Sequence, residues 1–402
     1  MVVAALLPPP PWLPKLWSTI LPDKLKELVI VKLRLDRRLI RNFDYYLLLT
    51  TVALCAIGTL TLYSATYGLE GLTDPLHFVK RQLLFAGLGF GLMLLIIFID
   101  YIDFSNWAGY LYVFNLFLLG LVLVVGEEEK GAMRRIQIGF FDLQPSEIAK
   151  VIIIITLARL LAEKEGQLAN FKDLLPALAA TALPMALIFF QPDLGTSLVF
   201  LAVLLVMLYV AGAQGRHLAL LIGAGLAVAP LFWFYLLKPY QKSRLLVFIN
   251  PEMDPTGQGF QLLQSMIGIG SGGLFGKGFA NSTQVRLGFL PDHYTDMIFS
   301  VFGEEMGYVG AVVLLLLYFF LIYRILWIST QAKDQFGALL CCGVAVMFAF
   351  QILVNIGMTI SIMPVTGIPL PFMSYGNNAL LVNLVSIGLV LNVALRRHKI
   401  QF

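Results

Sequence analysis

Charge is distributed along this chain in a way that only a membrane protein tolerates. Apolar blocks such as Val312 to Ile322 carry no charged residue, and the charged residues gather between the blocks. Of the 402 residues 59% are hydrophobic and 13% are charged, whereas a globular domain carries about 25% charged residues. A 20-residue helix rising about 1.5 Å per residue spans the roughly 30 Å hydrocarbon core. These runs predict an all-α integral membrane protein and exclude the alternating pattern of a β-barrel.

Ten segments have the apolar character of a membrane helix. They lie at about residues 45–65, 82–99, 107–125, 147–162, 174–190, 195–213, 217–236, 297–323, 336–360 and 376–395. The fifth contains Pro176 and Pro184, which membrane helices tolerate. We expect an N-terminal extension over 1–43, a membrane domain over 44–395 and a short tail over 396–402.

Lys and Arg flank the first and last helices, and this pattern predicts that both ends of the chain are cytoplasmic. The residues concerned are Lys32, Arg34, Arg37, Arg38, Arg41, Arg396, Arg397 and Lys399. Under this topology Lys130, Arg134 and Arg135 lie outside the cell, although Lys and Arg normally favour cytoplasmic loops. We therefore expect these three residues to have a functional role. Lys24 to Leu35 reads equally as an interfacial helix and as part of a poorly ordered extension.

The net charge of +4 and the lack of a basic stripe argue against a nucleic-acid partner. Cys55, Cys341 and Cys342 stand in apolar runs and are expected to be small buried residues.

About sixty residues, 237–295, break the membrane pattern and should form a long loop on the outer face. Such long loops are usually functional or disordered. This one contains many apolar residues and glycines, and 261–267 predicts a short amphipathic helix.

Ionisable groups at the edge of a membrane are costly and mark candidate sites. Glu147 and Lys150 follow Pro145 on one helix face, where they form either a site or a self-neutralising pair. Asp193, between two spans, either faces a site or caps the next helix.

Two further clusters lie at the outer loop. Arg244 and Lys277 could bind phosphate, or only anionic lipid. Asp296 stands where the loop becomes an apolar helix, so its carboxylate is a candidate base, with an N-cap as the alternative.

In their order, these motifs resemble the SEDS family (shape, elongation, division and sporulation), which includes RodA and FtsW. The resemblance covers about residues 44–395. The matching stretches are Gln144-Pro145-Ser146-Glu147 with Lys150, Gln191 to Thr196, Asn250-Pro251, Asp254-Pro255, Gln264-Ser265, Gly270 to Gly273, Gly276-Lys277-Gly278, Thr295-Asp296, Pro364 to Phe372 and Ser374-Tyr375-Gly376.

The resemblance implies a peptidoglycan glycosyltransferase of the bacterial cytoplasmic membrane, which polymerises lipid II on the outer face. Asp296 would be the catalytic base. The substrate-binding residues would be Arg134, Glu147, Lys150, Arg244, Gln264, Ser265, Lys277, Gln284 and Thr295. A divalent cation, Mg²⁺ or Mn²⁺, is a candidate for stabilising the leaving charge, and no organic cofactor is expected.

Within the family the chain looks more like RodA than FtsW, on Asn355 to Met358, Gly367 to Leu370 and Thr283-Gln284. It departs from the family pattern at four positions: Asp292, Tyr294, Arg135 and Asn377. The alternatives are an FtsW-like division enzyme, a lipid II flippase using Glu147, Lys150 and Asp193, and a scaffold without activity.

The expected partners are lipid II, the nascent glycan strand, membrane lipids, the elongation or division machinery and a class B penicillin-binding protein. Small residues at Ala338, Ala345 and Ala349 share one face of the helix over 336–360. Since small residues favour close helix packing in lipid, we expect the partner's helix to dock there.

Overall fold

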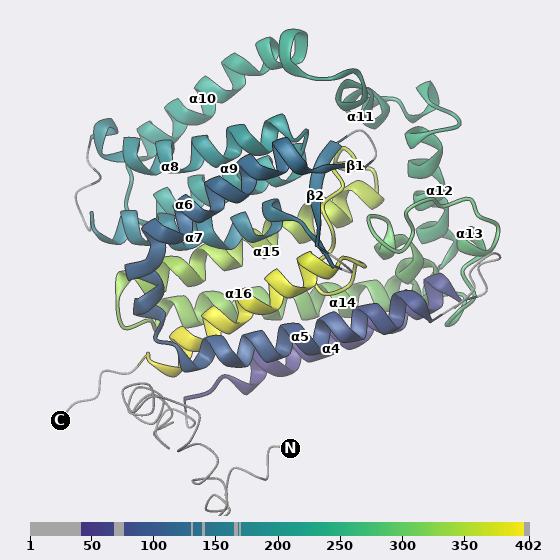
Figure 1. Cartoon of the computed structure of the whole chain (residues 1–402). Coiled ribbons are helices and arrows are strands. Elements are labelled where there is room, and N and C mark those ends of the chain that lie inside the picture. The colour runs from purple at the N-terminus through teal and green to yellow at the C-terminus, as the bar shows by residue number, and fades with distance from the viewer. Residues whose placement is uncertain are drawn as a thin grey trace, which may run out of the picture. The chain divides into compact units, whose positions relative to one another are not determined.

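The computed structural model describes residues 42–67, 76–129, 132–138, 141–164, 168 and 170–397. The N-terminal extension, including the expected interfacial helix over 24–35, lies outside these ranges, as does Lys130. The chain divides into two units, Met1–Asn42 and Phe43–Phe402, and the fold described here is that of the second (Figure 1).

All ten expected segments are helical. They are α4 (Tyr45–Thr66), α5 (His77–Phe98), α6 (Tyr101–Val125), α7 (Pro145–Ala162), α8 (Phe171–Phe190), α9 (Leu194–Val210), α10 (Gly215–Leu231), α14 (Ile298–Thr330), α15 (Gln335–Thr359) and α16 (Asn377–Leu395). A π-helical turn, η2 (Phe232–Leu236), continues α10. Among the described residues, eight helices are long and apolar enough to cross a membrane, and α9 is apolar but shorter. The all-α membrane fold is confirmed, while the number of ten crossings stays a prediction.

Two helices begin several residues earlier than hydropathy indicated. Helix α5 starts at His77, and α6 starts at Tyr101 directly after Asp100, whose carboxylate accepts a hydrogen bond from the Ile102 amide. Hydropathy marks only the apolar part of a helix, so polar first turns such as that of α5 are missed.

Helix α15 lies inside the bundle, where it packs against α14, α7, α9 and α16 (Figure 1). Ala345 is only 1% exposed, and a β-carbon added to Gly343 would lie 2.6 Å from the Ile154 side chain. The small residues of α15 therefore admit neighbouring helices of the same chain. Ala338 and Ala349 on the same helix are only half-buried, so docking of the partner's helix on 336–360 stays a prediction.

The long segment between η2 and α14 is folded. It contains α11 (Pro239–Ile249), the 3₁₀ turn η3 (Pro251–Met253), α12 (Gln258–Ser271) and α13 (Thr283–Arg286). The helix expected over 261–267 is confirmed as part of α12. Helix α11 was not expected. Pro239 stands in its first turn, and the Gln241 side chain accepts a hydrogen bond from the Lys238 amide, an arrangement typical of a helix start.

The glycine-rich turn after α12 packs directly on the first part of α14. Its backbone forms four hydrogen bonds with that helix, from Lys277 and Gly278 to the carbonyls of Glu304 and Glu305, and from Tyr308 and Val309 to those of Gly273 and Leu274. At this point α14 is interrupted at Gly307, which has φ 65° and ψ −165°. The glycines thus allow two backbones to approach each other closely.

Three short strands, which the sequence analysis did not predict, connect α6 to α7. They are β1 (Glu127–Glu129), β2 (Ala132–Ile138) and β3 (Phe141–Leu143), joined antiparallel in the order β1-β2-β3. Arg134 and Ile136 are half-buried and alternate with exposed Arg135 and Gln137. This alternation is the period of a half-buried strand, and it places Arg134 and Arg135 on opposite faces of β2.

Candidate active site

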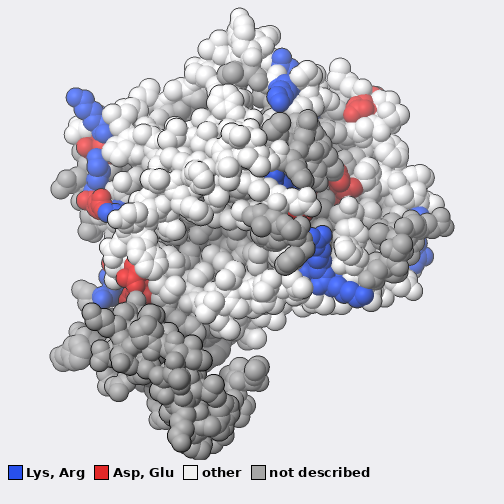
Figure 2. Space-filling view, in the orientation of Figure 1, with Lys and Arg blue, Asp and Glu red and all other residues white. Residues whose placement is uncertain are grey.

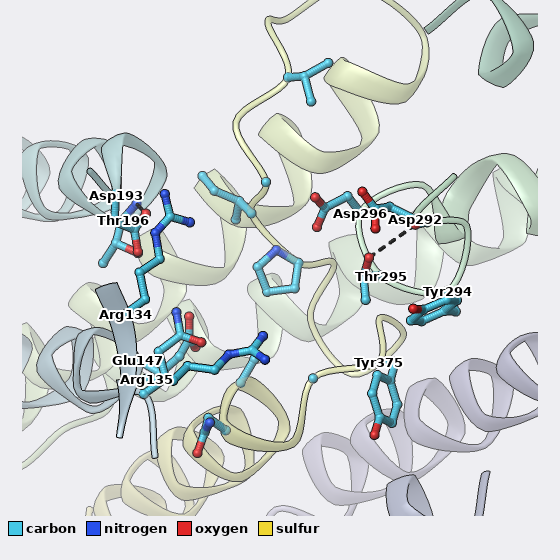
Figure 3. Close-up of a pocket in the computed structure, with 18 of the residues that line it drawn as sticks. Arg134, Arg135, Glu147, Asp193, Thr196, Asp292, Tyr294, Thr295, Asp296 and Tyr375 are labelled. Carbon is cyan, nitrogen blue, oxygen red and sulfur yellow. Dashed lines mark hydrogen bonds between the residues drawn. The ribbon is translucent and has the colours of Figure 1, made fainter. Parts of the chain in front are cut away.

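A polar cavity of about 860 Å³ lies where β2, the starts of α7 and α9, helix α11 and the loops before α14 and α16 meet. Figure 2 shows that most of the surrounding face carries no charged side chain, and that acidic and basic residues gather near the position of β2. Figure 3 shows Arg134, Arg135, Glu147 and Asp193 on one side of the cavity and Asp292, Thr295 and Asp296 on the other.

Two arginines from different elements are fixed by backbone carbonyls. Arg134 donates hydrogen bonds to the carbonyls of Gln191 and Pro192. Arg244 donates through Nη1 to the carbonyl of Thr366 at 3.2 Å and lies 5.8 Å from the ring centre of Tyr240. Both guanidinium groups line the cavity and are held in a defined place there.

The electrostatics of Arg244 show which groups it faces. Burial lowers the pKa of its guanidinium, and Arg134 lowers it further, whereas Asp296 is the largest influence that raises it. A guanidinium nevertheless stays charged in proteins. The site therefore holds two neighbouring positive charges close to the Asp296 carboxylate.

Asp296 precedes α14 in a turn that is tied to two other segments. Its backbone carbonyl accepts a hydrogen bond of 3.1 Å from the side-chain amide of Asn355, and the same amide nitrogen also donates to the Ile368 carbonyl at 2.8 Å. Met297, and not Asp296, occupies the N-cap position of α14, and no side chain caps that helix. The alternative interpretation of Asp296 as an N-cap is wrong, and its carboxylate lines the cavity.

Gly367 lies beside both the carboxylate of Asp296 and the guanidinium of Arg244. A β-carbon at this position would lie 3.5 Å from Asp296 Oδ2 and 3.9 Å from Arg244 Nη1. Its φ of +75° is also a conformation that suits glycine. A glycine here therefore keeps a side chain out of the cavity wall beside the acidic and the basic group.

Glu147 and Lys150 form the ion pair that their spacing predicted. Lys150 Nζ lies 2.7 Å from Glu147 Oε2, and both side chains are buried at the start of α7. Asp193 caps α9, because its carboxylate accepts hydrogen bonds from the amide and the hydroxyl of Thr196. The pairing and capping interpretations are confirmed, and these residues also line the cavity.

Thr295 lines the cavity as well, and its hydroxyl donates to the carbonyl of Asp292 at 3.2 Å. The four positions at which the chain departs from the family pattern, Asp292, Tyr294, Arg135 and Asn377, all line the cavity too. The departures therefore change the walls of this site.

Four residues expected to bind substrate are not among those that line the cavity: Gln264, Ser265, Lys277 and Gln284. Lys277 instead forms an ion pair of 2.6 Å with buried Glu304. Ser265 donates to the Thr359 carbonyl at 2.7 Å.

Sequence reasoning missed His77, Phe78 and Arg81, which line the cavity from the start of α5. Their only signal is a polar flank before an apolar block. Tyr240 in α11 and Gln261 in α12 also line the cavity, and the sequence analysis did not name either as a site residue.

The described residues contain no group of three or more His, Cys, Asp or Glu side chains arranged to hold a metal ion. Magnesium often needs only one or two carboxylates together with substrate phosphates. Asp292 and Asp296 belong to one turn of the cavity wall (Figure 3), so a cation bound jointly with a substrate phosphate fits these residues.

The arrangement suits transfer of a group from an anionic leaving group to a hydroxyl. A carboxylate beside a cavity can accept a proton, and preorganised cations stabilise negative charge that develops in a transition state. Asp296 is placed for the first role, and Arg134 and Arg244 are placed for the second.

Comparison with known proteins identifies the relatives of this fold and site. The family model described as "Cell cycle protein" (FtsW, RodA, SpoVE) matches residues 45–399. "Stage V sporulation protein E" of Bacillus subtilis is 39% identical over 87% of this chain and 96% of that protein. "Peptidoglycan glycosyltransferase MrdB" of Escherichia coli is 36% identical over 90% of this chain and 95% of that protein.

Two solved structures share the fold. One, from "Structural coordination of polymerization and crosslinking by a peptidoglycan synthase complex", has a TM-score of 0.76 and 36% identity, covering 89% of this chain and 99% of that chain. The other, the Thermus thermophilus rod shape determining protein RodA, has a TM-score of 0.67 and 34% identity, covering 89% of this chain and 98% of that chain.

Proposed function

Because this chain belongs to the FtsW, RodA and SpoVE family, we propose that it is a peptidoglycan glycosyltransferase that polymerises lipid II on the outer face of the cytoplasmic membrane. The observation that carries the proposal is the placement of the Asp296 carboxylate and the Arg244 guanidinium beside Gly367 in one cavity. A base and a cation in the same cavity match the needs of a hydroxyl acceptor and a pyrophosphate donor.

In the proposed reaction, Asp296 takes the proton from the 4-hydroxyl of the acceptor N-acetylglucosamine. The hydroxyl oxygen then bonds to the anomeric carbon of the donor, with inversion, and the bond to undecaprenyl pyrophosphate breaks. Arg244 and Arg134 stabilise the charge on the leaving pyrophosphate. Lys150 contributes less, since its ammonium already pairs with Glu147.

We assign the chain to the elongation branch, which maintains cell shape. Support comes from the Asn355 to Met358 run, whose first residue holds the turn of Asp296, and from the fold shared with RodA. Expression of this chain should restore rod shape in cells depleted of RodA, whereas rescue only of septation in cells depleted of FtsW would assign it to division.

A class B penicillin-binding protein is the proposed partner, because glycan strands need a transpeptidase to crosslink them. The named peptidoglycan synthase complex, which coordinates polymerization and crosslinking, supports this pairing. Docking of its helix on α15 rests on Ala338 and Ala349, which are half-buried, since Ala345 is buried within the chain.

A lipid II flippase is the rival function, and the pairing of its expected residues argues against it. A transport path would use the charges of Glu147 and Lys150, but these neutralise each other in an ion pair. The candidate base also stands before α14, outside the helix that would line a path.

Replacement of Asp296 tests the function. Asp296→Asn keeps the shape of the side chain but cannot accept the proton, so purified enzyme should lose about 10²- to 10⁴-fold in polymerisation rate. Strand formation from lipid II by protein reconstituted with and without its partner is the measurement. Glu252→Gln, an exposed change in the same outer segment, should retain the parent rate.

Absence of polymerisation by the parent protein, with its partner present, would contradict the proposed function. Normal polymerisation by a folded Asp296→Asn protein would remove only the assignment of the base.

A further inference from the structure

Three aromatic side chains form a cluster in the wall of the cavity. Phe78, Tyr294 and Tyr375 all line it. The ring centre of Phe78 lies 4.9 Å from that of Tyr294 and 5.1 Å from that of Tyr375. The ring centres of the two tyrosines lie 6.0 Å apart. We call these three residues the aromatic cluster.

The aromatic cluster joins three segments that are far apart in the sequence: the start of α5, the turn before α14 and the loop before α16. The amide of Tyr375 donates a hydrogen bond of 2.9 Å to the carbonyl of Tyr294, which fixes the two loops to each other. The three side chains are half-buried. Part of each ring thus contacts its neighbours, and part faces the cavity.

The cluster lies on the same wall as the candidate base. Tyr294 precedes Asp296 by two residues in one turn, and Figure 3 shows Tyr294 and Tyr375 on the side of Asp292 and Asp296, away from Arg134 and Arg135. One side of the cavity therefore carries Arg134 and Arg135, with Glu147 paired to Lys150 and Asp193 capping α9, and the other side combines aromatic rings with Asp292 and Asp296.

These two sides differ in the ligand groups that they can bind. Guanidinium groups bind phosphates, whereas carboxylates repel them. Aromatic rings offer a broad apolar surface with a polar edge at the tyrosine hydroxyl. A pyranose ring has a matching character, since one face carries C–H groups and its rim carries hydroxyls.

We propose that the aromatic cluster is the stacking surface for an N-acetylhexosamine ring of the acceptor, and that it directs the acceptor hydroxyl toward Asp296. The inference rests on the proposed function, which it deepens by assigning the two sides of the cavity to donor pyrophosphate and acceptor sugar. Tyr294, at a position where the chain departs from the family pattern, is the specificity-determining member.

Two measurements test the proposal. In polymerisation assays, Tyr294→Leu and Tyr375→Leu should raise the lipid II concentration for half-maximal rate about three- to tenfold and shorten the strands. Tyr294→Phe and Tyr375→Phe, which keep the ring and lose only the hydroxyl, should show a smaller increase than the Leu variants. Tyr63→Leu is the matched control, because Tyr63 stacks on Phe279 at 6.2 Å outside the residues that line the cavity.

The second measurement does not depend on activity. Saturation-transfer NMR with N,N′-diacetylchitobiose and the reconstituted full chain should show transfer to the sugar C–H protons. This transfer should be lost in Tyr294→Leu and retained in Tyr294→Phe and Tyr63→Leu.

The outcomes separate the two proposals. Sugar contacts that depend on the aromatic cluster, in a parent protein that does not polymerise, would support the cluster and contradict the proposed function. Leu variants that match the parent in half-saturation, strand length and saturation transfer would overturn the cluster's role. So would a Tyr63→Leu protein with the same defects.

Discussion

The carboxylate of Asp296 is positioned through its own backbone. A single buried amide, that of Asn355, donates to the carbonyls of Asp296 and Ile368 and so connects α15 to both loops that border the site. Asn355 is a positioning residue, because its contacts are to the backbone of the base and not to the cavity.

Asn355→Ala should lower the turnover number about 10- to 100-fold while leaving the half-saturating lipid II concentration nearly unchanged, since small displacements of catalytic groups are costly. Asn392→Ala is a matched control: that buried amide also donates to two carbonyls, those of Ile96 and Ile99. Both variants should lose about 1–3 kcal/mol of stability, measured by thermal unfolding. Equal losses of turnover in the two variants would contradict a positioning role for Asn355.

Arg244 and Lys277 looked alike in sequence but differ in the structure, which predicts different mutant phenotypes. Arg244→Gln should weaken donor use at least tenfold, because it removes a cation from the cavity. Lys277→Gln should leave donor use intact and instead lower stability by about 1–3 kcal/mol, because buried Glu304 loses its ionic partner. Donor-concentration series and thermal unfolding of the two proteins separate the effects, and a donor defect in Lys277→Gln would contradict this assignment.

The residues of the site were predictable where a local motif carried them. Glu147 with Lys150 shows its pairing through spacing alone, and Asp296 shows its place at a loop–helix boundary. Lys277 was misassigned because its partner, Glu304, lies on another element 27 residues later, and no local pattern reports that contact. Phe78 and Tyr375 meet only through the tertiary fold.

At the scale of elements, apolar content predicted the helices but not their surroundings. Helix α15 was located correctly, yet lipid and the rest of a membrane protein are equally apolar, so hydropathy cannot tell which of them covers a helix. Short polar elements such as β2 and α11 were missed because they give too few residues for a period to emerge.

The interruption of α14 at Gly307 should be essential to the fold. A β-carbon there would lie 2.3 Å from the backbone nitrogen of Gly276, and its φ of +65° disfavours other residues. Gly307→Ala should destabilise the protein by at least about 1–3 kcal/mol and reduce the yield of folded protein. Gly120→Ala in α6, with no heavy atom near the added carbon, should be neutral or slightly stabilising. Comparable melting temperatures for the two variants would contradict this account of the turn.

At the scale of the whole molecule, flank charges predict cytoplasmic ends and an external 237–295 segment. A cysteine at Ser271, an exposed residue at the end of α12, should react with a membrane-impermeant maleimide added to intact cells, and a cysteine at Lys399 should not. Cys55, Cys341 and Cys342 are buried, so the parent protein should give little background. Labelling at position 399 but not 271 would invert the topology.

The interruption of α14 divides its length into two parts. As one straight helix its 33 residues would measure about 50 Å, more than the roughly 30 Å apolar slab, but the chain turns at Gly307. The part from Tyr308 to Thr330 alone measures about 34 Å and fills that slab. With this part spanning the slab, we expect Asp296, ahead of the interruption, at the depth of the lipid phosphates. Under the proposed function, a prenyl-linked substrate would keep its tail among the acyl chains and its pyrophosphate near its resting depth, while the sugar moves into place.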